Sequence, residues 1–317
     1  MVRLIGQRLV QLPLVIVAVS VLVFMLIQVV PGDVGRNALG PYATAEQVAA
    51  WNTAHGLDGG ALAQYMSWIG GLATGDWGTS LVYGVPVRDL VPGRLLNSIA
   101  LGMLAFAILV PPALALAAFQ ARVEGSLIDR SLTIVVMALA AIPEFVIGVL
   151  LLVAFAVAIP LFPVQSMGGT EGGLLPPLRA MILPAITLAI GWFALVARTA
   201  RTGALEAMKS QYHRTAVVKG LSTGAVFRRH LARNSLASTV ALLGISLGAL
   251  LGGSAVVETL FGYPGLGELI VTATQRKDAP LLAVGVMATG VISVLGVLAA
   301  DIAFVLMDPR VRFERGE

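Results

Sequence analysis

The side chains that usually carry out enzymatic chemistry are sparse in this sequence and do not fall into a catalytic spacing. The chain has no cysteine, which excludes thiol nucleophiles, iron–sulfur clusters and thiolate zinc sites. His55, His213 and His230 do not form the H-E-x-x-H spacing of a zinc peptidase. The Lys-Ser pair at 209–210 follows Met208, so no phosphate-binding loop for ATP is formed there. We therefore expect no catalytic residue, metal or cofactor in this chain.

Two acidic residues interrupt stretches that are otherwise apolar. Glu144 follows Pro143, and Asp301 lies near the end of the last apolar stretch. An ionised carboxylate that faces lipid costs several kcal/mol, so each should face the inside of a helix bundle or a water-filled path. A structural role, such as pairing with a loop Arg or a helix end, is an equal alternative for Glu144. It is the better interpretation for Asp301.

The composition indicates a surface that faces lipid more than water. Of the 317 residues, 57% are hydrophobic and 12% are charged, whereas soluble domains carry about 25% charged residues. The net charge of +4 could indicate nucleic-acid binding, but basic residues in a membrane protein usually mark cytoplasmic loops. We expect a lipid bilayer, and no nucleic acid, as the partner.

Six apolar stretches are close to, or longer than, the about 20 residues that a helix needs to cross a membrane. They cover residues 9–30, 98–119, 131–159, 181–196, 236–257 and 281–307. Lipid offers no partner to a backbone amide, so these runs should be helices. The predicted fold is an all-α polytopic membrane protein with about six transmembrane helices. The fourth stretch is the weakest, because Pro177 and Pro184 bracket its start.

The predicted organisation has two parts, residues 1–97 and 98–317. The first contains one helix, uncleaved because no small-residue cleavage site follows it, and an extracytoplasmic loop region. The second contains the other five helices and a long loop at 199–235. Most of the 21 Lys and Arg residues fall on one side of such a chain, most densely in that loop. The loop and both termini should therefore be cytoplasmic.

The long loop contains an ordered pattern that simple anchoring to the membrane does not require. Tyr212, Thr215, Ala216 and Lys219 recur at the spacing of one helix face. Gly220 follows at the position of a helix C-terminus, where glycine is favoured. The pattern predicts a short helix, a tight turn and a second helix, with a small-residue face suited to docking into a groove of another protein.

These residues resemble the coupling-loop signature of binding-protein-dependent ABC importer permeases, most closely the dipeptide, oligopeptide and nickel branch. The signature is Tyr212-x-x-Thr215-Ala216-x-x-Lys219-Gly220-Leu221-Ser222. Further groups similar to that branch are Pro31-Gly32-Asp33, Gln64-Tyr65, Gly75-Asp76-Trp77-Gly78-x-Ser80, Glu258-x-x-Phe261-x-x-Pro264-Gly265-x-Gly267, Asp301 and Asp308-Pro309-Arg310-x-Arg312. The resemblance covers nearly the whole chain.

The resemblance implies a type I permease fold in the bacterial cell membrane and a mechanism driven by partner proteins. Two ATPase subunits, which bind ATP and Mg, would move the segment from Tyr212 to Leu221 and switch the spans between inward-open and outward-open states. A second, related permease and an extracytoplasmic solute-binding protein complete the implied importer. Many relatives carry Glu where this chain has Arg214, so ion pairing with the ATPase differs there. The turn that holds Glu258, Pro264 and Gly265 is interpreted as part of an external gate or receptor-docking surface.

Three glycines recur every four residues in the fifth stretch, at Gly244, Gly248 and Gly252. A glycine strip lets two helix backbones approach closely in lipid. We expect the strip to pack against the partner permease or another span, with a generic glycine-rich span as the alternative.

Peptides are the expected cargo, with nickel or another small solute as the alternative. A secondary transporter would show networks of intramembrane charge and internal repeats, and a membrane-embedded enzyme would show converging polar clusters. Neither pattern is apparent in the sequence. An ATP-independent secondary transporter is therefore the less favoured alternative.

Overall fold

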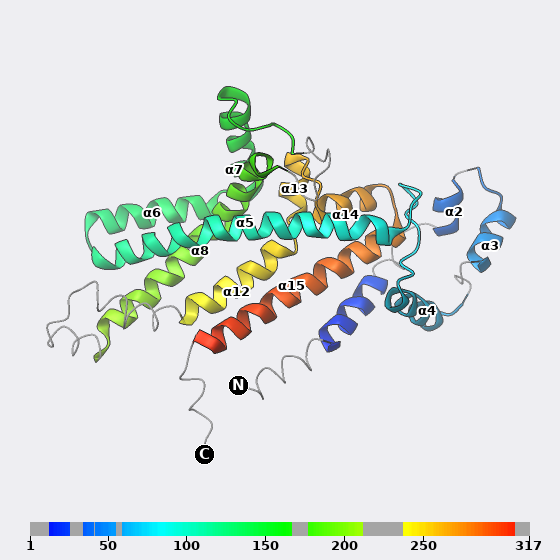
Figure 1. Ribbon diagram of the computed structural model, residues 1–317, viewed down its shortest axis with the longest axis horizontal. Helices are drawn as coiled ribbons and strands as arrows, with labels where there is room; N and C mark the ends of the chain where they lie inside the picture. Colours follow the sequence, from blue (N-terminus) through cyan, green and yellow to red (C-terminus); the bar gives the residue numbers. More distant parts are fainter. Residues whose placement is uncertain are drawn as a thin grey trace, which may run out of the picture.

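The computed structural model describes residues 13–25, 34–40, 42–54, 59–166, 177–211 and 237–307, and this part of the chain is built from helices (Figure 1). A first apolar helix, Pro13–Met25, is followed by α2 (Val34–Leu39), α3 (Ala45–Ala54), α4 (Ala61–Thr74), α5 (Val87–Arg122), α6 (Leu127–Ala141), α7 (Glu144–Leu152), the π-helix η1 (Val153–Ala158), α8 (Leu178–Lys209), α12 (Ala237–Leu251), α13 (Ala255–Phe261), α14 (Leu266–Gln275) and α15 (Ala279–Met307). Among the described residues, the one strand-like pairing is an isolated bridge between Thr79 and Pro86. The predicted all-α fold is confirmed.

Three of the described helices are long and apolar enough to cross a membrane: α5, α8 and the Ala279–Ala299 part of α15. Two further candidates are bent pairs, α6 with α7 and η1, and α12 with α13. The structure thus has three to five candidate spans in its described part, where the sequence suggests about six. The first predicted stretch is represented by the shorter helix Pro13–Met25.

The predicted stretch at 131–159 is a sharply bent pair of helices instead of one straight span. The two halves meet at 96°, and Figure 1 shows α7 leaving the bundle nearly at right angles to α6. Proline disfavours helical backbone in the residue before it and lacks an amide hydrogen. Ile142 is accordingly extended, with φ −83° and ψ 124°, and Pro143 caps the start of α7. The bend is therefore encoded by Pro143.

The helix expected to be the weakest, α8, is the most enclosed of the long spans. The apolar 18-residue stretch of α8 is 61% buried, whereas the corresponding stretches are 28% buried in α5 and 33% buried in α15. Pro184 lies inside α8 and is itself buried. The helix also extends past Val196 to Lys209, so residues 199–209, which were expected to begin the cytoplasmic loop, are helical.

The contact between α5 and α8 forms the centre of the bundle. On α5, residues at every fourth position are fully or almost fully buried: Leu101, Ala105, Leu109, Ala113 and Ala117. This row of small and medium side chains packs against Leu188, Val196 and Ala197 of α8. Rows four residues apart lie on one face of a helix, which allows the two helices to interlock over several turns.

The predicted glycine strip of α12 lies against α15 of the same chain. A Cβ atom built on Gly248 would lie 2.8 Å from the carbonyl oxygen of Ser293, and one built on Gly252 would lie 2.5 Å from the hydroxyl of Ser293. From the other side, a Cβ on Gly296 would lie 2.8 Å from the Cα of Gly248. The two backbones thus touch without side chains between them. Gly244 is buried one turn earlier on the same helix.

We predict that Gly248→Leu separates α12 from α15 and lowers thermal stability. Overpacking of this kind costs about 1–3 kcal/mol. Thermal unfolding of the purified protein in detergent measures the loss. Ala249→Leu is the matched control, because Ala249 is exposed on the neighbouring face of α12. An unfolding temperature for Gly248→Leu equal to that of the control would contradict the packing argument.

Candidate functional site

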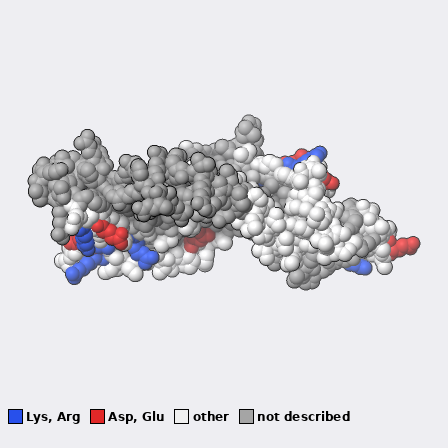
Figure 2. Space-filling model, turned by 90° about the horizontal axis from the view of Figure 1, so that it is seen from below, with Lys and Arg blue, Asp and Glu red and all other residues white. Residues whose placement is uncertain are grey.

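The segment predicted to dock onto another protein follows shortly after the end of α8. Its residues lie outside the described part of the chain: Tyr212, Arg214, Thr215, Ala216, Lys219, Gly220 and Leu221. The structure describes the end of the bundle from which this segment leaves, where α5 ends, α6 begins and α8 ends. We call this part of the bundle, formed by the end of α5, the start of α6 and the end of α8, the basic end. Figure 2 shows a group of Lys and Arg side chains there, on the left, with acidic side chains beside them.

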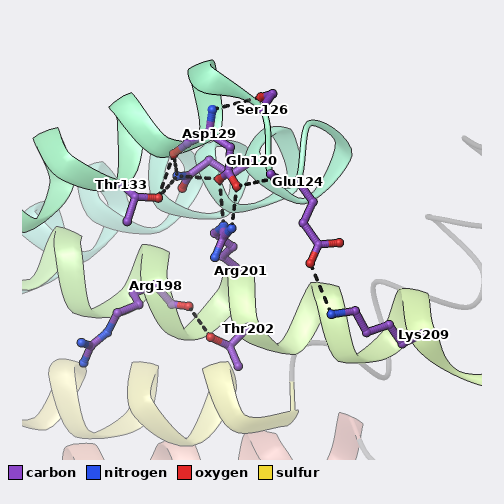
Figure 3. Close-up of polar contacts among 10 residues, drawn as sticks. Gln120, Glu124, Ser126, Asp129, Thr133, Arg198, Arg201, Thr202 and Lys209 are labelled. Atoms are coloured by element: carbon purple, nitrogen blue, oxygen red, sulfur yellow. Dashed lines mark hydrogen bonds and ion pairs between the residues drawn. The ribbon is translucent and has the colours of Figure 1, made fainter.

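A buried carboxylate joins three elements at the basic end (Figure 3). Asp129 of α6 accepts two hydrogen bonds from the guanidinium of Arg201 on α8, at 3.1 Å from Nε to Oδ1 and 2.7 Å from Nη2 to Oδ2. The backbone amide of Gly125 donates to Oδ2 at 3.0 Å, and Gln120 of α5 donates to Oδ1 at 3.4 Å. Such a bidentate ion pair fixes both the distance and the relative orientation of the two side chains.

Local sequence explains why Asp129 occupies this position. Gly125 takes a left-handed backbone conformation, with φ +77°, and turns the chain back after α5. Ser126 then caps α6 by accepting a hydrogen bond from the amide of Asp129 at 3.2 Å. An acidic residue in the first turn of a helix is also favoured by the helix dipole. Contacts within the turn itself thus hold the carboxylate where Arg201 of α8 reaches it.

A second ion pair at the basic end lies at the surface. Lys209, the last residue of α8, donates to Glu124 at 3.3 Å, and their side chains are 69% and 45% exposed. Exposed pairs of this kind contribute little to stability, typically 0 to about 1 kcal/mol. The side chain of Asp129, in contrast, is 4% exposed.

The two helix breaks in the middle of the chain are joined by a hydrogen bond. Glu144, at the start of α7, accepts from the hydroxyl of Ser254 at 3.0 Å. Ser254 is also the N-cap of α13, where it accepts from the amide of Val257 at 3.3 Å. The preceding Gly253 turns the chain with φ +79°. Glu144, which is partly buried, thus lies at a junction of two broken helices.

The other half of the bundle holds the first turns of α5 together with α13 and α14, and we call it the far end (Figure 1). It is organised around Glu258 of α13. This carboxylate is fully buried. It accepts from the hydroxyl of Ser98 on α5 at 2.7 Å and from the amide of Glu268 on α14 at 3.1 Å. The Ser98 hydroxyl in turn accepts from the amide of Leu266 at 2.8 Å. In this conformation Glu258 joins α5, α13 and α14 from within and does not itself form a docking surface.

The glycines and proline predicted beside Glu258 form the turn that surrounds its carboxylate. A Cβ on Gly265 would lie 2.4 Å from carboxylate atoms of Glu258, and one on Gly267 would lie 2.8 Å away. The carbonyl of Pro264 accepts a hydrogen bond from the side chain of Asn97 at 2.7 Å. The structure therefore brings Glu258, Pro264 and Gly265 together, and only residues without a side chain fit against the acid.

Three further polar contacts fasten the loop before α5, and the start of α5 itself, to the α14–α15 region. Asp278 is fully buried and accepts from the Ser80 hydroxyl at 2.5 Å and from the amide of Val82 at 3.1 Å. Arg94 of α5 forms an ion pair with Glu268 at 3.1 Å. These contacts set the position of residues 80–94 relative to α15.

Two regions of the chain match families of known membrane proteins. Residues 113–313 match the family described as "Binding-protein-dependent transport system inner membrane component". Residues 1–82 match the N-terminal model of such membrane components. The chain belongs to this family. The resemblance seen in its sequence motifs is thereby confirmed.

Relatives of this permease align with it over almost their whole length. The chain is 32% identical to "Probable peptide ABC transporter permease protein y4tP" of Sinorhizobium fredii, over 97% of the chain and 98% of the relative. It is 29% identical to "Oligopeptide transport system permease protein AppB" of Bacillus subtilis, over 98% and 99%. It is 32% identical to "Dipeptide transport system permease protein DppB" of Lactococcus lactis, over 98% and 100%.

Several polar residues that organise the permease were not singled out from its sequence. Ser126 and Asp129 carry the spacing of a helix-start motif, which could have located the beginning of α6. Arg201 and Ser98 give no such signal, because their partners are distant in the chain. Asp301 lies in α15, but its side chain is outside the described part. Among the described residues, no cluster of three or more His, Asp or Glu could hold a metal ion.

We predict that Ser98→Ala destabilises the far end of the permease. The change leaves Glu258 without one donor and the amide of Leu266 without its acceptor, and an unsatisfied buried polar group costs about 1–3 kcal/mol. Thermal unfolding in detergent should show the lower stability. Thr274→Ala serves as the control, since Thr274 is exposed and its hydroxyl donates to the carbonyl of Ile270 in the same helix. Equal unfolding temperatures for the two variants would count against this role of Ser98.

Proposed function

We propose that this permease forms half of the translocation path of an ATP-driven importer that takes up peptides delivered by an extracytoplasmic solute-binding protein. The other half is a second, related permease. Two ATPase subunits bind ATP and Mg, and no enzymatic step takes place in this chain. The observation that carries the proposal is the alignment of the whole chain with permeases named for peptide, oligopeptide and dipeptide transport.

The proposed point of contact with the ATPases is the patterned segment from Tyr212 to Leu221. Its predicted small-residue face suits docking into a groove. The segment follows shortly after α8, the most enclosed of the long spans. A push on a helix that is packed along much of its length moves its neighbours with it, which makes α8 a suitable lever.

The proposed orientation places the basic end, the segment after α8 and both termini in the cytoplasm. Most Lys and Arg residues of the sequence lie on that side, as expected for cytoplasmic loops. The far end, with Glu258 and the turn at Pro264 and Gly265, then faces the solute-binding protein. This orientation supports the interpretation of that turn as part of an external gate, with Glu258 holding it from inside.

Peptide cargo is tested with the assembled importer. The permease, its partner permease, the ATPases and the solute-binding protein are reconstituted in lipid vesicles, and uptake of a labelled dipeptide and of nickel is compared. ATP-dependent uptake of the dipeptide is expected. Uptake of nickel but not of the dipeptide would support the alternative cargo. Uptake without ATP or ATPases would indicate a secondary transporter.

We predict that Gly220→Val uncouples ATP hydrolysis from transport. A side chain at this predicted helix end adds strain to the left-handed cap and stiffens the turn beside the docking face. Membrane insertion should be unchanged, while stimulation of ATPase activity by the loaded binding protein should fall about tenfold, or about 1.4 kcal/mol. Gly60→Val is the control, because a Cβ on Gly60 meets no atom within 4 Å. Unchanged stimulation in Gly220→Val would rule out the lever.

The orientation can be tested directly because the chain has no cysteine. A membrane-impermeant maleimide added to intact spheroplasts should label Thr274→Cys, at the far end, and not Ser222→Cys. Both should react after the membrane is opened. Labelling of Ser222→Cys from outside would reverse the orientation and remove the basis for an ATPase contact at this segment.

A further inference from the structure

Polar contacts at the basic end attach α6 to the rest of the bundle: Asp129 binds Arg201 of α8, and Gln120 of α5 donates to Asp129 and, at 3.1 Å, to the hydroxyl of Thr133. Only Asp129 and Val136 are buried among the residues of α6. Large apolar side chains on its other faces are exposed, with Leu127 at 80% and Ile134 at 68%. Apolar packing therefore holds α6 weakly within this chain. Asp129 provides its most specific contact with α8.

The contact is placed where a movement of α8 would be transmitted first. Arg201 lies on the last turns of α8, and the remaining residues to Lys209 rise only about 12 Å at 1.5 Å per residue. The same carboxylate also holds the turn after α5, through the amide of Gly125, and meets Gln120 of α5. Thus α8, the end of α5 and the start of α6 meet at a single side chain (Figure 3).

The neighbouring ion pair cannot replace this contact. Lys209 and Glu124 bridge the same region, but both side chains are exposed to solvent, and their long, mobile chains allow many arrangements. The guanidinium of Arg201 meets Asp129 with two parallel hydrogen bonds. That geometry resists both separation and rotation.

We propose that Asp129 and Arg201 are positioning residues that make α6 follow α8 during the transport cycle. The proposal rests on the proposed function, because the force on α8 comes from the ATPases at the segment after it. Movement of α6 then reaches the bend at Pro143, where Glu144 contacts Ser254 at the break between α12 and α13. The pair thus links the ATPase side of the permease to both of its broken helices.

The first test measures whether α6 and α8 move together. Spin labels are attached to Leu127→Cys and Thr202→Cys, both exposed positions, in the full importer with otherwise cysteine-free subunits. Their distance distribution is recorded by pulsed electron paramagnetic resonance in the resting and ATP-bound states. We expect the same narrow distribution in both states, and a broader one when Asp129→Asn is added. A distance that changes between the two states of the otherwise unchanged chain would overturn the proposal.

The second test separates positioning from simple stability. Asp129→Asn leaves the charge of Arg201 without its partner, so both thermal stability and the number of peptides imported per ATP should fall. The double variant Asp129→Asn with Arg201→Gln removes both charges. It should regain stability while the coupling ratio stays at least several-fold below that of the unmodified importer. Glu124→Gln, which breaks the exposed pair, is the matched control and should leave both quantities unchanged.

The second test distinguishes a failure of the positioning role from a failure of the proposed importer function. If the unmodified complex couples ATP hydrolysis to peptide uptake but Asp129→Asn couples equally well, the positioning role is refuted and the importer stands. The same conclusion holds if the double variant recovers coupling together with stability. If the unmodified complex neither binds ATPases nor imports peptides, the importer itself is refuted.

Discussion

Lipid offers no hydrogen-bond partner to a backbone amide or carbonyl, so a chain that crosses a membrane has to satisfy these groups within the protein. In this permease the constraint explains where polar side chains are found. Each helix break is accompanied by a side chain or a turn that occupies freed backbone groups. Ser254 caps α13 and meets Glu144 at the other break. Between the breaks and the ends of the bundle, α5 and α8 are joined by rows of alanine and leucine.

Under the same constraint, the two ends of the bundle use different polar contacts. At the basic end a carboxylate meets a guanidinium across three elements, and the contact fixes helices relative to one another. At the far end the carboxylate of Glu258 meets hydroxyl and amide donors inside a glycine turn. Because glycine is needed at Gly265 for that turn to close, the far end has little freedom to repack. Side chains from distant segments thus meet at both ends, and the far end adds a compact glycine turn around its carboxylate.

The sequence predicted most of the helices but not the polar contacts between them. Apolar length predicted the spans but took residues 131–159 as one. Pro143 explains the boundary of α7 in retrospect, whereas the size of the bend depends on packing that no local pattern records. The fourth stretch, the least certain of the six because of its prolines, is a helix: Pro177 precedes its first turn, where a missing amide donor is tolerated, and Pro184 is accommodated inside α8. For the site, glycine spacing and the acid beside Pro264 were visible in advance. The pairing of Asp129 with Arg201 joins residues far apart in the chain, and only the fold places them together.

The bend between α6 and α7 also limits what this chain can do alone. The 15 residues of α6 rise about 22 Å, which is shorter than the apolar layer of about 30 Å. If α6 starts at one interface, it ends at a depth where water is absent; there the carbonyl of Leu139 accepts from the amide of Ile142 at 3.2 Å, while other carbonyls of the last turn have no later helical amide to bind them. A neighbouring subunit or a hydrated channel has to cover that exposed helix terminus. The short helix therefore makes the polar backbone of this chain, and not only its apolar surface, depend on what surrounds it in the bilayer.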